Sequence, residues 1–126
     1  MAISMDGSDP ATWDPALDGV LAAPENHQVL YEDDVIRVIS VTILPGAIEK
    51  PHHHQRPSVF VIDRMVKLHD FNGATHEEIP LPLPKNVEFP ITVKFPPQPL
   101  HYVKNTDTKP FHATRIEFKK GFPTGM

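Results

Sequence analysis

Three consecutive histidines, His52, His53 and His54, are the residues of this sequence best suited to carry chemistry. They lie in the middle of the chain, between Pro51 and Gln55, and not at a terminus. In an extended strand alternate side chains share a face, so His52 and His54 would point one way and His53 the other. Two imidazoles on an inner wall are half of a metal site, whereas His53 is predicted to be a surface residue.

The other histidines differ in their surroundings along the chain. His101 follows the proline-rich segment 96–99 and begins an apolar stretch, which makes it a candidate to complete the site. His27, His69 and His76 lie in or beside expected turns, where a solvated imidazole is the ordinary case. His112 belongs to an alternating set on the last expected strand, and it would line the pocket if that set faces inward.

The composition favours an all-β domain that positions these side chains. The 126 residues include 15 prolines and no cysteine, so long helices are disfavoured and thiolate metal sites and disulfides are excluded. The β-branched run 35–44 ends at the turn Pro45-Gly46, and Asn72-Gly73 is a strong hairpin signal. We expect eight to ten short strands that close into a barrel or sandwich.

The expected organisation is a single barrel with an arm. Residues 1–27 form the N-terminal arm, 28–120 the barrel and 121–126 a C-terminal tail. Residues 1–10 are expected to be disordered, and Asp14 and Pro15 to cap and begin a short helix. Every charged residue of the first 36 is acidic, so the arm either lies over a mildly basic body or is a solvated acidic tail.

Charge and hydropathy also exclude some partners and locations. Basic residues are scattered singly and do not alternate with aromatics, so no nucleic-acid groove is expected. No apolar run approaches the length of a membrane span, and the first basic residue is Arg37, so no signal-peptide n-region is recognisable. We therefore expect a cytoplasmic protein that binds neither nucleic acid nor membrane.

The spacing around the histidine run resembles the first motif of the cupin superfamily. That motif is Gly, five residues, His-x-His, three or four residues, Glu, then six residues and Gly. Here Gly46 is followed by five residues and His52-x-His54, and Ser58 or Val59 stands where Glu is expected. Both histidines are retained, while the Glu and the closing Gly are lost.

The second cupin motif also has a counterpart. It is Gly, five residues, Pro-x-Gly, two residues, His, three residues, Asn. Here it becomes Pro90, five residues, Pro96-x-Gln98, two residues, His101, three residues, Asn105. The resemblance spans roughly residues 28–119 and is nearest to the small single-domain bacterial cupins of uncharacterised function. It implies an all-β, jelly-roll-like cupin barrel.

Carried over residue by residue, the resemblance implies a metal site of His52, His54 and His101. Cupins bind a divalent first-row metal, and Fe, Ni, Zn, Cu and Mn all remain open here. Ser58 at the Glu position leaves the fourth ligand in doubt. A three-His centre keeps the metal's full charge, which favours an anionic ligand, and it leaves coordination positions open. The alternative is a metal-free polar pocket.

A small apolar pocket is expected around this centre. Ser58 is assigned to its lining. Three more side chains are assigned there because they alternate in step with Ser58 or His101 along their strands, and a fourth because it belongs to the alternating set of the last strand. These four are Phe60, Ile62, Val103 and His112. Arg37 and Arg56 would either anchor a carboxylate or form salt bridges. Glu49, in the loop before the histidines, is a further candidate carboxylate for the site, although nothing in the spacing requires it to approach.

The resulting functional hypothesis is a metal-binding cupin that binds a small organic molecule, with dioxygenase-like or isomerase-like chemistry. The alternative is a non-enzymatic small-molecule-binding or sensing module without bound metal. A third hypothesis is an interaction protein whose barrel only supports a dimer. Small cupins are usually homodimers, and open strand edges need covering, so we expect a homodimer.

Overall fold

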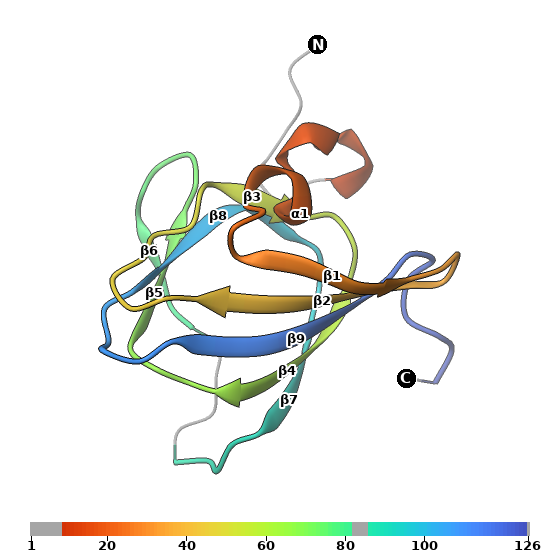
Figure 1. Cartoon of the computed structure of the whole chain (residues 1–126). Coiled ribbons are helices and arrows are strands. Elements are labelled where there is room, and N and C mark those ends of the chain that lie inside the picture. Colours follow the sequence, from red (N-terminus) through yellow and green to blue (C-terminus); the bar gives the residue numbers. More distant parts are fainter. Residues whose placement is uncertain (1–8, 82–85, 126) are drawn as a thin grey trace.

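The structure is a computed structural model that describes residues 9–81 and 86–125. Within these ranges the chain forms nine strands in two antiparallel sheets, with short helical turns confined to the N-terminal segment (Figure 1). The all-β prediction is therefore confirmed. The expected disorder of the first residues concerns mainly 1–8, which lie outside the described residues.

The larger sheet has five strands in the order β1-β2-β9-β4-β7, so strands distant in sequence lie side by side. Its central strands alternate buried and half-buried positions, as expected for strands with one face on the core. The strands are β1 His27–Glu32, β2 Ile36–Ile43, β9 Phe111–Phe118, β4 Ser58–Arg64 and β7 Ile91–Phe95.

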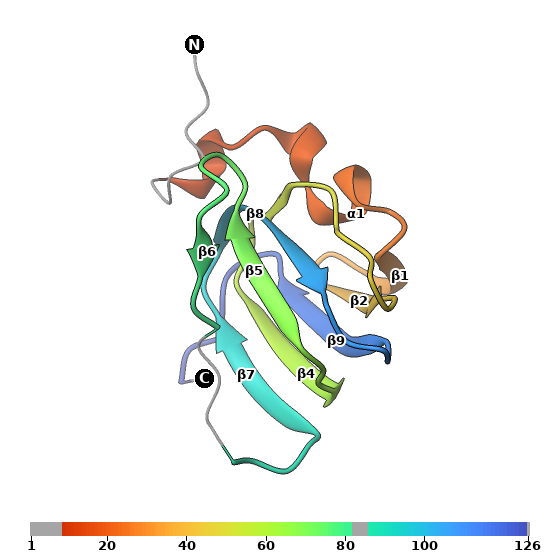
Figure 2. The same ribbon diagram turned by 90° about the vertical axis from the view of Figure 1, so that its left-hand side faces the viewer.

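The smaller sheet has four strands in the order β3-β8-β5-β6 and faces the larger one across the interior (Figure 2). Asn72-Gly73 lies at the turn between β5 and β6, where the hairpin was predicted. These strands are β3 His52–His54, β8 Gln98–Asn105, β5 Leu68–Asn72 and β6 Glu78–Ile79.

The apolar core lies on the inner face of the larger sheet. Its seven buried side chains come from alternate positions of β2, β4 and the start of β9, where β-branched and aromatic residues pack well. They are Ile39, Val41, Ile43, Phe60, Ile62, Phe111 and Ala113. The inward face of β9 continues with Arg115 and Glu117, both buried, so the interior changes from apolar to polar along this strand.

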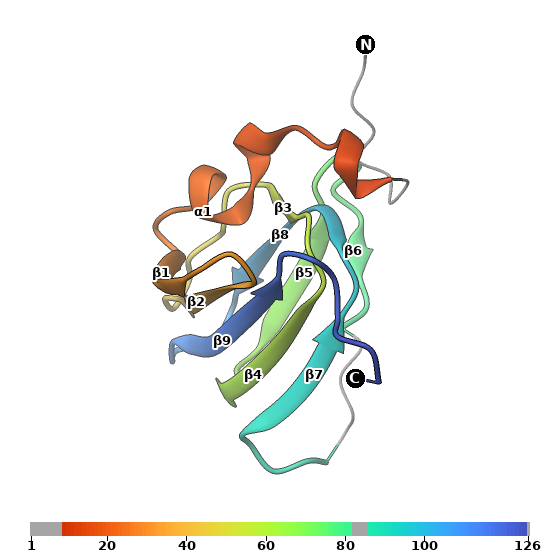
Figure 3. The same ribbon diagram turned by 90° about the vertical axis from the view of Figure 1, so that its right-hand side faces the viewer.

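The N-terminal segment crosses one end of the barrel beside β3 (Figure 3). It consists of η1 Pro10–Thr12, η2 Pro15–Leu17 and α1 Gly19–Ala22. Asp14 caps η2, since its Oδ1 accepts from the Ala16 N–H at 3.0 Å, but the expected helix is interrupted at Asp18. None of the described helices has the length and hydropathy needed to cross a membrane.

Gly19 packs directly against the histidine strand. A Cβ atom there would lie 2.8 Å from His54 Cε1 and 3.2 Å from His52 Cδ2. Asp18 also forms an isolated bridge with His53. The segment is therefore docked on the barrel and not a solvated tail.

Candidate metal centre

Strand pairing brings together the histidines of the two motifs. β3 lies antiparallel to β8 with His52 opposite His101, while alternation along β3 turns His54 to the same side as His52. The ring centroids are 4.8 Å apart for His52 and His101, 5.0 Å for His52 and His54, and 5.5 Å for His54 and His101. The three residues of the predicted site thus lie around a common space.

His27 joins this group as a fourth imidazole. It is the first residue of β1, only 4% exposed, with its ring centroid 4.7 Å from that of His52 and 5.4 Å from that of His54. One nitrogen from each of these three residues lies within 4.8 Å of the other two. The prediction that His27 is solvated was wrong, because it pairs with the inward-facing Val41 of β2 and so shares its face.

Three of the four rings are oriented by a hydrogen bond through Nδ1. The Nδ1 atom donates to the Ala23 carbonyl in His27, to the Lys50 carbonyl in His52 and to Asp70 in His101, over 2.9, 2.7 and 2.8 Å. This leaves Nε2 as the atom with the free lone pair, as in metal-ligating histidines held by an outer partner. The Nε2 atoms of His52 and His101 are buried without a partner among the described residues.

The imidazoles of His27, His52 and His54 are held neutral. Burial, reinforced by the positive charges around the site, lowers the pKa of His27 to about 4 and those of His52 and His54 well below the ordinary value. A metal ligand must be deprotonated, so these nitrogens are ready to bind a cation at neutral pH. The donor set therefore fits a divalent transition metal.

Glu49 brings a carboxylate to the histidines from the segment before β3. It is 4% exposed, and its Oε1 accepts from the Val103 N–H at 3.1 Å. Its Oε2 lies 3.7 Å from His27 Nε2 and 3.9 Å from His52 Nε2. Burial raises the pKa of Glu49 to about 7, so a nearby cation is needed for it to be fully ionised at neutral pH.

Ser58, which stands at the motif's Glu position, bonds to Arg115 and to none of the described histidines. It is fully buried at the start of β4, and its Oγ accepts from Arg115 Nη1 at 2.7 Å. Among the described residues it is not part of the cavity lining, although it was assigned there. Arg115, which does line the cavity, is the residue that bonds to the Ser58 hydroxyl.

The histidines open onto a cavity of about 80 Å³ inside the barrel. Phe60, Ile62 and Val103 line it, in the positions that strand parity gave them. The rest of the wall combines further apolar side chains with a few polar ones. These are Val41, Ile43, Met65, Leu68, Leu81, Phe95 and Phe111, with Glu49, Asp70, Gln98 and Arg115.

The assignment of His112 to the pocket was wrong. The inward set on β9 is Phe111, Ala113, Arg115 and Glu117, so His112 lies on the outer face of the sheet. There its ring nitrogens hydrogen-bond with Ser40 and Asp63. The sequence showed the alternation but not which of the two sets faces inward.

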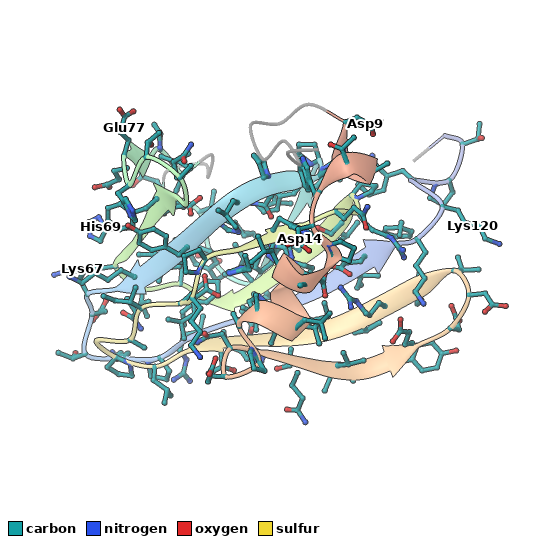
Figure 4. All side chains as sticks on the ribbon, turned by 90° about the horizontal axis from the view of Figure 1, so that it is seen from above. Asp9, Asp14, Lys67, His69, Glu77 and Lys120 are labelled. Carbon is teal, nitrogen blue, oxygen red and sulfur yellow. The ribbon has the colours of Figure 1, made fainter. Side chains whose placement is uncertain are left out.

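The three remaining histidines lie outside the cavity. His53 points away from it as predicted, but it is 1% exposed, because the N-terminal segment covers it: Nε2 donates to the Asp14 carbonyl at 2.6 Å. His69 and His76 are in the expected exposed setting, His69 beside Glu78 and His76 beside Tyr102. His69 lies at the periphery, away from Asp14 of the covering segment (Figure 4).

The arginines considered as carboxylate anchors have other roles. Arg37 donates to Glu117 and to Asp18, each at 2.8 Å, which resolves its two alternatives in favour of a salt bridge. Arg56 does not belong to the described cavity lining. The buried arginine that does line the cavity is Arg115, which sequence reasoning missed because nothing distinguished it from other residues of the last strand.

Comparison with known proteins identifies the fold. No family model and no curated protein matches the sequence. Among solved structures, a cupin domain from Bordetella pertussis Tohama I superposes with a TM-score of 0.61 and 19% identity, covering 74% of this chain and 91% of that one.

Two further structures extend the likeness. An RmlC-like cupin family protein with a double-stranded β-helix fold from Methanocaldococcus jannaschii gives a TM-score of 0.53 at 10% identity over 73% of this chain and 77% of that one. An uncharacterised conserved protein with a double-stranded β-helix domain from Klebsiella pneumoniae gives 0.50 at 12%, over 74% and 75%. At these identities the likeness shows the fold alone.

Proposed function

We propose that this chain, which has the cupin fold, binds a divalent first-row transition metal at its histidine centre and a small organic molecule in the adjoining cavity. The observation that carries the proposal is the pair of buried Nε2 atoms, on His52 and His101, that lack a partner among the described residues. An unsatisfied buried acceptor is costly, and a metal ion would satisfy both at once.

The ligand set draws on both strand pairing and burial. The cupin motifs imply His52, His54 and His101 as ligands, whereas the closest nitrogen atoms in the structure are those of His27, His52 and His54. His52 and His54 therefore belong to both sets. Glu49 is placed to supply the negative charge that Ser58 does not provide. Neutral imidazoles with at most one carboxylate suit Fe, Ni, Zn, Cu or Mn.

A metal held in this way would act as a Lewis acid toward a ligand that occupies its open positions. The protein's own residues then have defined tasks. Asp70 and the Lys50 carbonyl orient the imidazoles, and the walls around Phe60 and Phe95 exclude water from the ligand. Dioxygenase-like and isomerase-like reactions, and metal-dependent binding without turnover, are all consistent with this arrangement.

The test is elemental analysis of protein purified without a histidine tag, followed by reloading of the chelator-treated protein with each candidate metal. We expect about one metal ion per chain in the wild type, because the donors form one cluster. His52→Ala should abolish binding, and separate His27→Ala and His101→Ala variants show which of the two completes the site. His53→Gln is the matched control, since it alters the same run but leaves the cavity intact.

The outcome that contradicts the proposal is wild-type protein that contains no metal and takes up none on reloading. Equal metal content in the His52→Ala and His53→Gln proteins would also contradict it, since binding would then lie elsewhere.

The homodimer and the cytoplasmic location stay predictions. β1 is an edge strand of the larger sheet and exposes Leu30 and Tyr31, 57% and 54% accessible, which supports association of a second copy along this edge. Light scattering of the wild type and a Leu30→Lys variant tests the dimer: the wild type should have twice the monomer mass and the variant the monomer mass.

A further inference from the structure

Arg115 is a buried cation inside the cavity that the metal proposal does not use. It lies on the inward face of β9, is 3% exposed, and lines the cavity together with the histidines. Its guanidinium carbon lies 4.5 Å from the ring centroid of Phe60 and 6.0 Å from that of Phe95. These two aromatic rings hold the guanidinium in a defined place.

Arg115 makes no ion pair with any carboxylate of the described residues. Its one side-chain hydrogen bond runs from Nη1 to the neutral Ser58 hydroxyl, and its Nε is buried without a partner. A guanidinium has five N–H donors in a fixed fork, so most of its bonding capacity remains unused.

The carboxylates nearby act on Arg115 only at longer range, and each has one oxygen engaged by another group. Glu117 accepts from Arg37, Asp70 accepts from His101, and Glu49 accepts from the Val103 N–H. Arg115 thus lacks the close counterion that a buried charge normally has.

Arg115 nevertheless keeps its charge. Burial lowers its pKa to about 10, which is still well above neutral pH. A buried charge without a close partner is costly, and the cost is removed when a ligand brings the missing anion. The guanidinium fork matches the two oxygens of a carboxylate.

We propose that Arg115 is the anchor for the carboxylate of a compact ligand that occupies the cavity. The ligand's apolar body would lie against Phe60, Phe95 and Val103, with its other end toward the histidines; in that last respect the inference rests on the proposed function. A monoanion fits better than a phosphate, because Glu49, Asp70 and Glu117 surround the site with negative charge and most of the wall is apolar.

The experiment measures binding of butyrate and 2-oxobutyrate by ligand-observed NMR, with butyramide as the neutral isostere, on metal-free and metal-loaded protein. We expect the carboxylates to bind both forms about 10- to 100-fold more tightly than the amide, as for a charge-assisted bond to a buried partner. Arg115→Gln should lose this preference by a similar factor. Arg64→Gln, an equal change of charge at an exposed residue of β4, is the control and should bind like the wild type.

Two results would overturn the inference: equal affinity for butyrate and butyramide, or carboxylate binding that is unchanged in Arg115→Gln. Carboxylate binding that requires metal but not Arg115 overturns it and leaves the metal proposal intact. Arg115-dependent binding to a protein that takes up no metal supports it and contradicts the metal proposal.

A measurement on the wild type keeps the test independent of whether Arg115→Gln folds. The Nε–H resonance of Arg115 should shift and its exchange with water should slow as butyrate is added, because the carboxylate covers the guanidinium. An unchanged resonance at saturating butyrate overturns the inference.

Discussion

Two arginines on neighbouring strands, the half-buried Arg37 and the buried Arg115, have opposite surroundings. Arg37 of β2, at the junction between the N-terminal segment and the barrel, is paired with Asp18 and Glu117. Although burial opposes it, these carboxylates raise the pKa of Arg37 above its usual value. Arg115 of β9, in the cavity, has only a hydroxyl partner, and burial lowers its pKa.

The difference separates polar groups that stabilise this fold from those available to a ligand. At the junction Arg37 pairs with both Asp18 and Glu117, while the second Glu117 oxygen, Oε2, is buried 3.5 Å from His54 Nδ1 without a hydrogen bond among the described residues. In the cavity, unpartnered atoms of His52, His101 and Arg115 surround one common space. Both regions hold charged groups, so it is the convergence of several unpartnered groups on one cavity that marks the candidate site.

The strongest way to break this comparison is to remove each arginine. Arg37→Met should lower the free energy of unfolding by about 3–5 kcal/mol, since it leaves Glu117 and Asp18 without their cation. Arg115→Met should change it by less than about 1 kcal/mol or increase it, because an unpaired buried charge is replaced by an apolar side chain. Urea unfolding monitored by Trp13 fluorescence measures both; equal losses would show that Arg115 is structural too.

Lowering the pH should reduce the stability of the protein through the buried histidines of the cavity. His27, His52 and His54 have lowered pKa values when folded, so stability from them is complete above pH 6.5 and is lost as pH falls toward 4. Glu49 and Glu117, whose pKa values burial raises, act in the opposite sense in this range. The three histidines outnumber the two carboxylates, so we expect metal-free protein to lose stability on acidification, and each histidine can contribute up to about 1.4 kcal/mol per pH unit.

Unfolding of chelator-treated protein at several pH values between 4 and 7 measures this slope. Bound metal should deepen the loss on acidification, because protons compete with it for the imidazoles. Stability that is constant or rises as pH falls to 4 would contradict burial of neutral histidines.

The packing of the N-terminal segment against His52 and His54 can be disturbed by a larger side chain at Gly19. Gly19→Val places atoms where His54 Cε1 and His52 Cδ2 now lie, so we expect a loss of about 1–3 kcal/mol from overpacking, together with weaker metal binding. Leu21→Val, on the exposed side of the same helical turn, is the control. Chemical unfolding and metal titration should change together in Gly19→Val and remain as in the wild type in the control.

The smallest effect is expected on the outer face of the larger sheet. His112→Ala removes hydrogen bonds with Ser40 and Asp63 at a half-exposed site, so stability should fall by no more than about 1 kcal/mol. Metal content and butyrate affinity should not change. A loss of metal or of butyrate affinity would show that His112 contributes to the cavity and would contradict its position on the outer face of β9.

Much of the fold could be read from local patterns. Proline frequency, β-branched runs and the Asn72-Gly73 turn depend on short-range sterics, and they predicted an all-β barrel with the correct hairpin. The grouping of His52 with His101 was implied by the resemblance to the cupin motifs. Parity along β3 gave the directions of His52, His53 and His54 but not their burial, because the segment that covers His53 lies far away in sequence.

The sequence by itself determined the types of residue that could hold a metal and the strands that carry His52, His54 and His101. Only the tertiary structure decided that His27 and Glu49 join them, that His112 does not, and that Arg115 lies in the cavity without a counterion. The physical reason is that alternation along a strand defines two sets of side chains, whereas which set is buried, and beside which charges, depends on strands and segments distant in sequence.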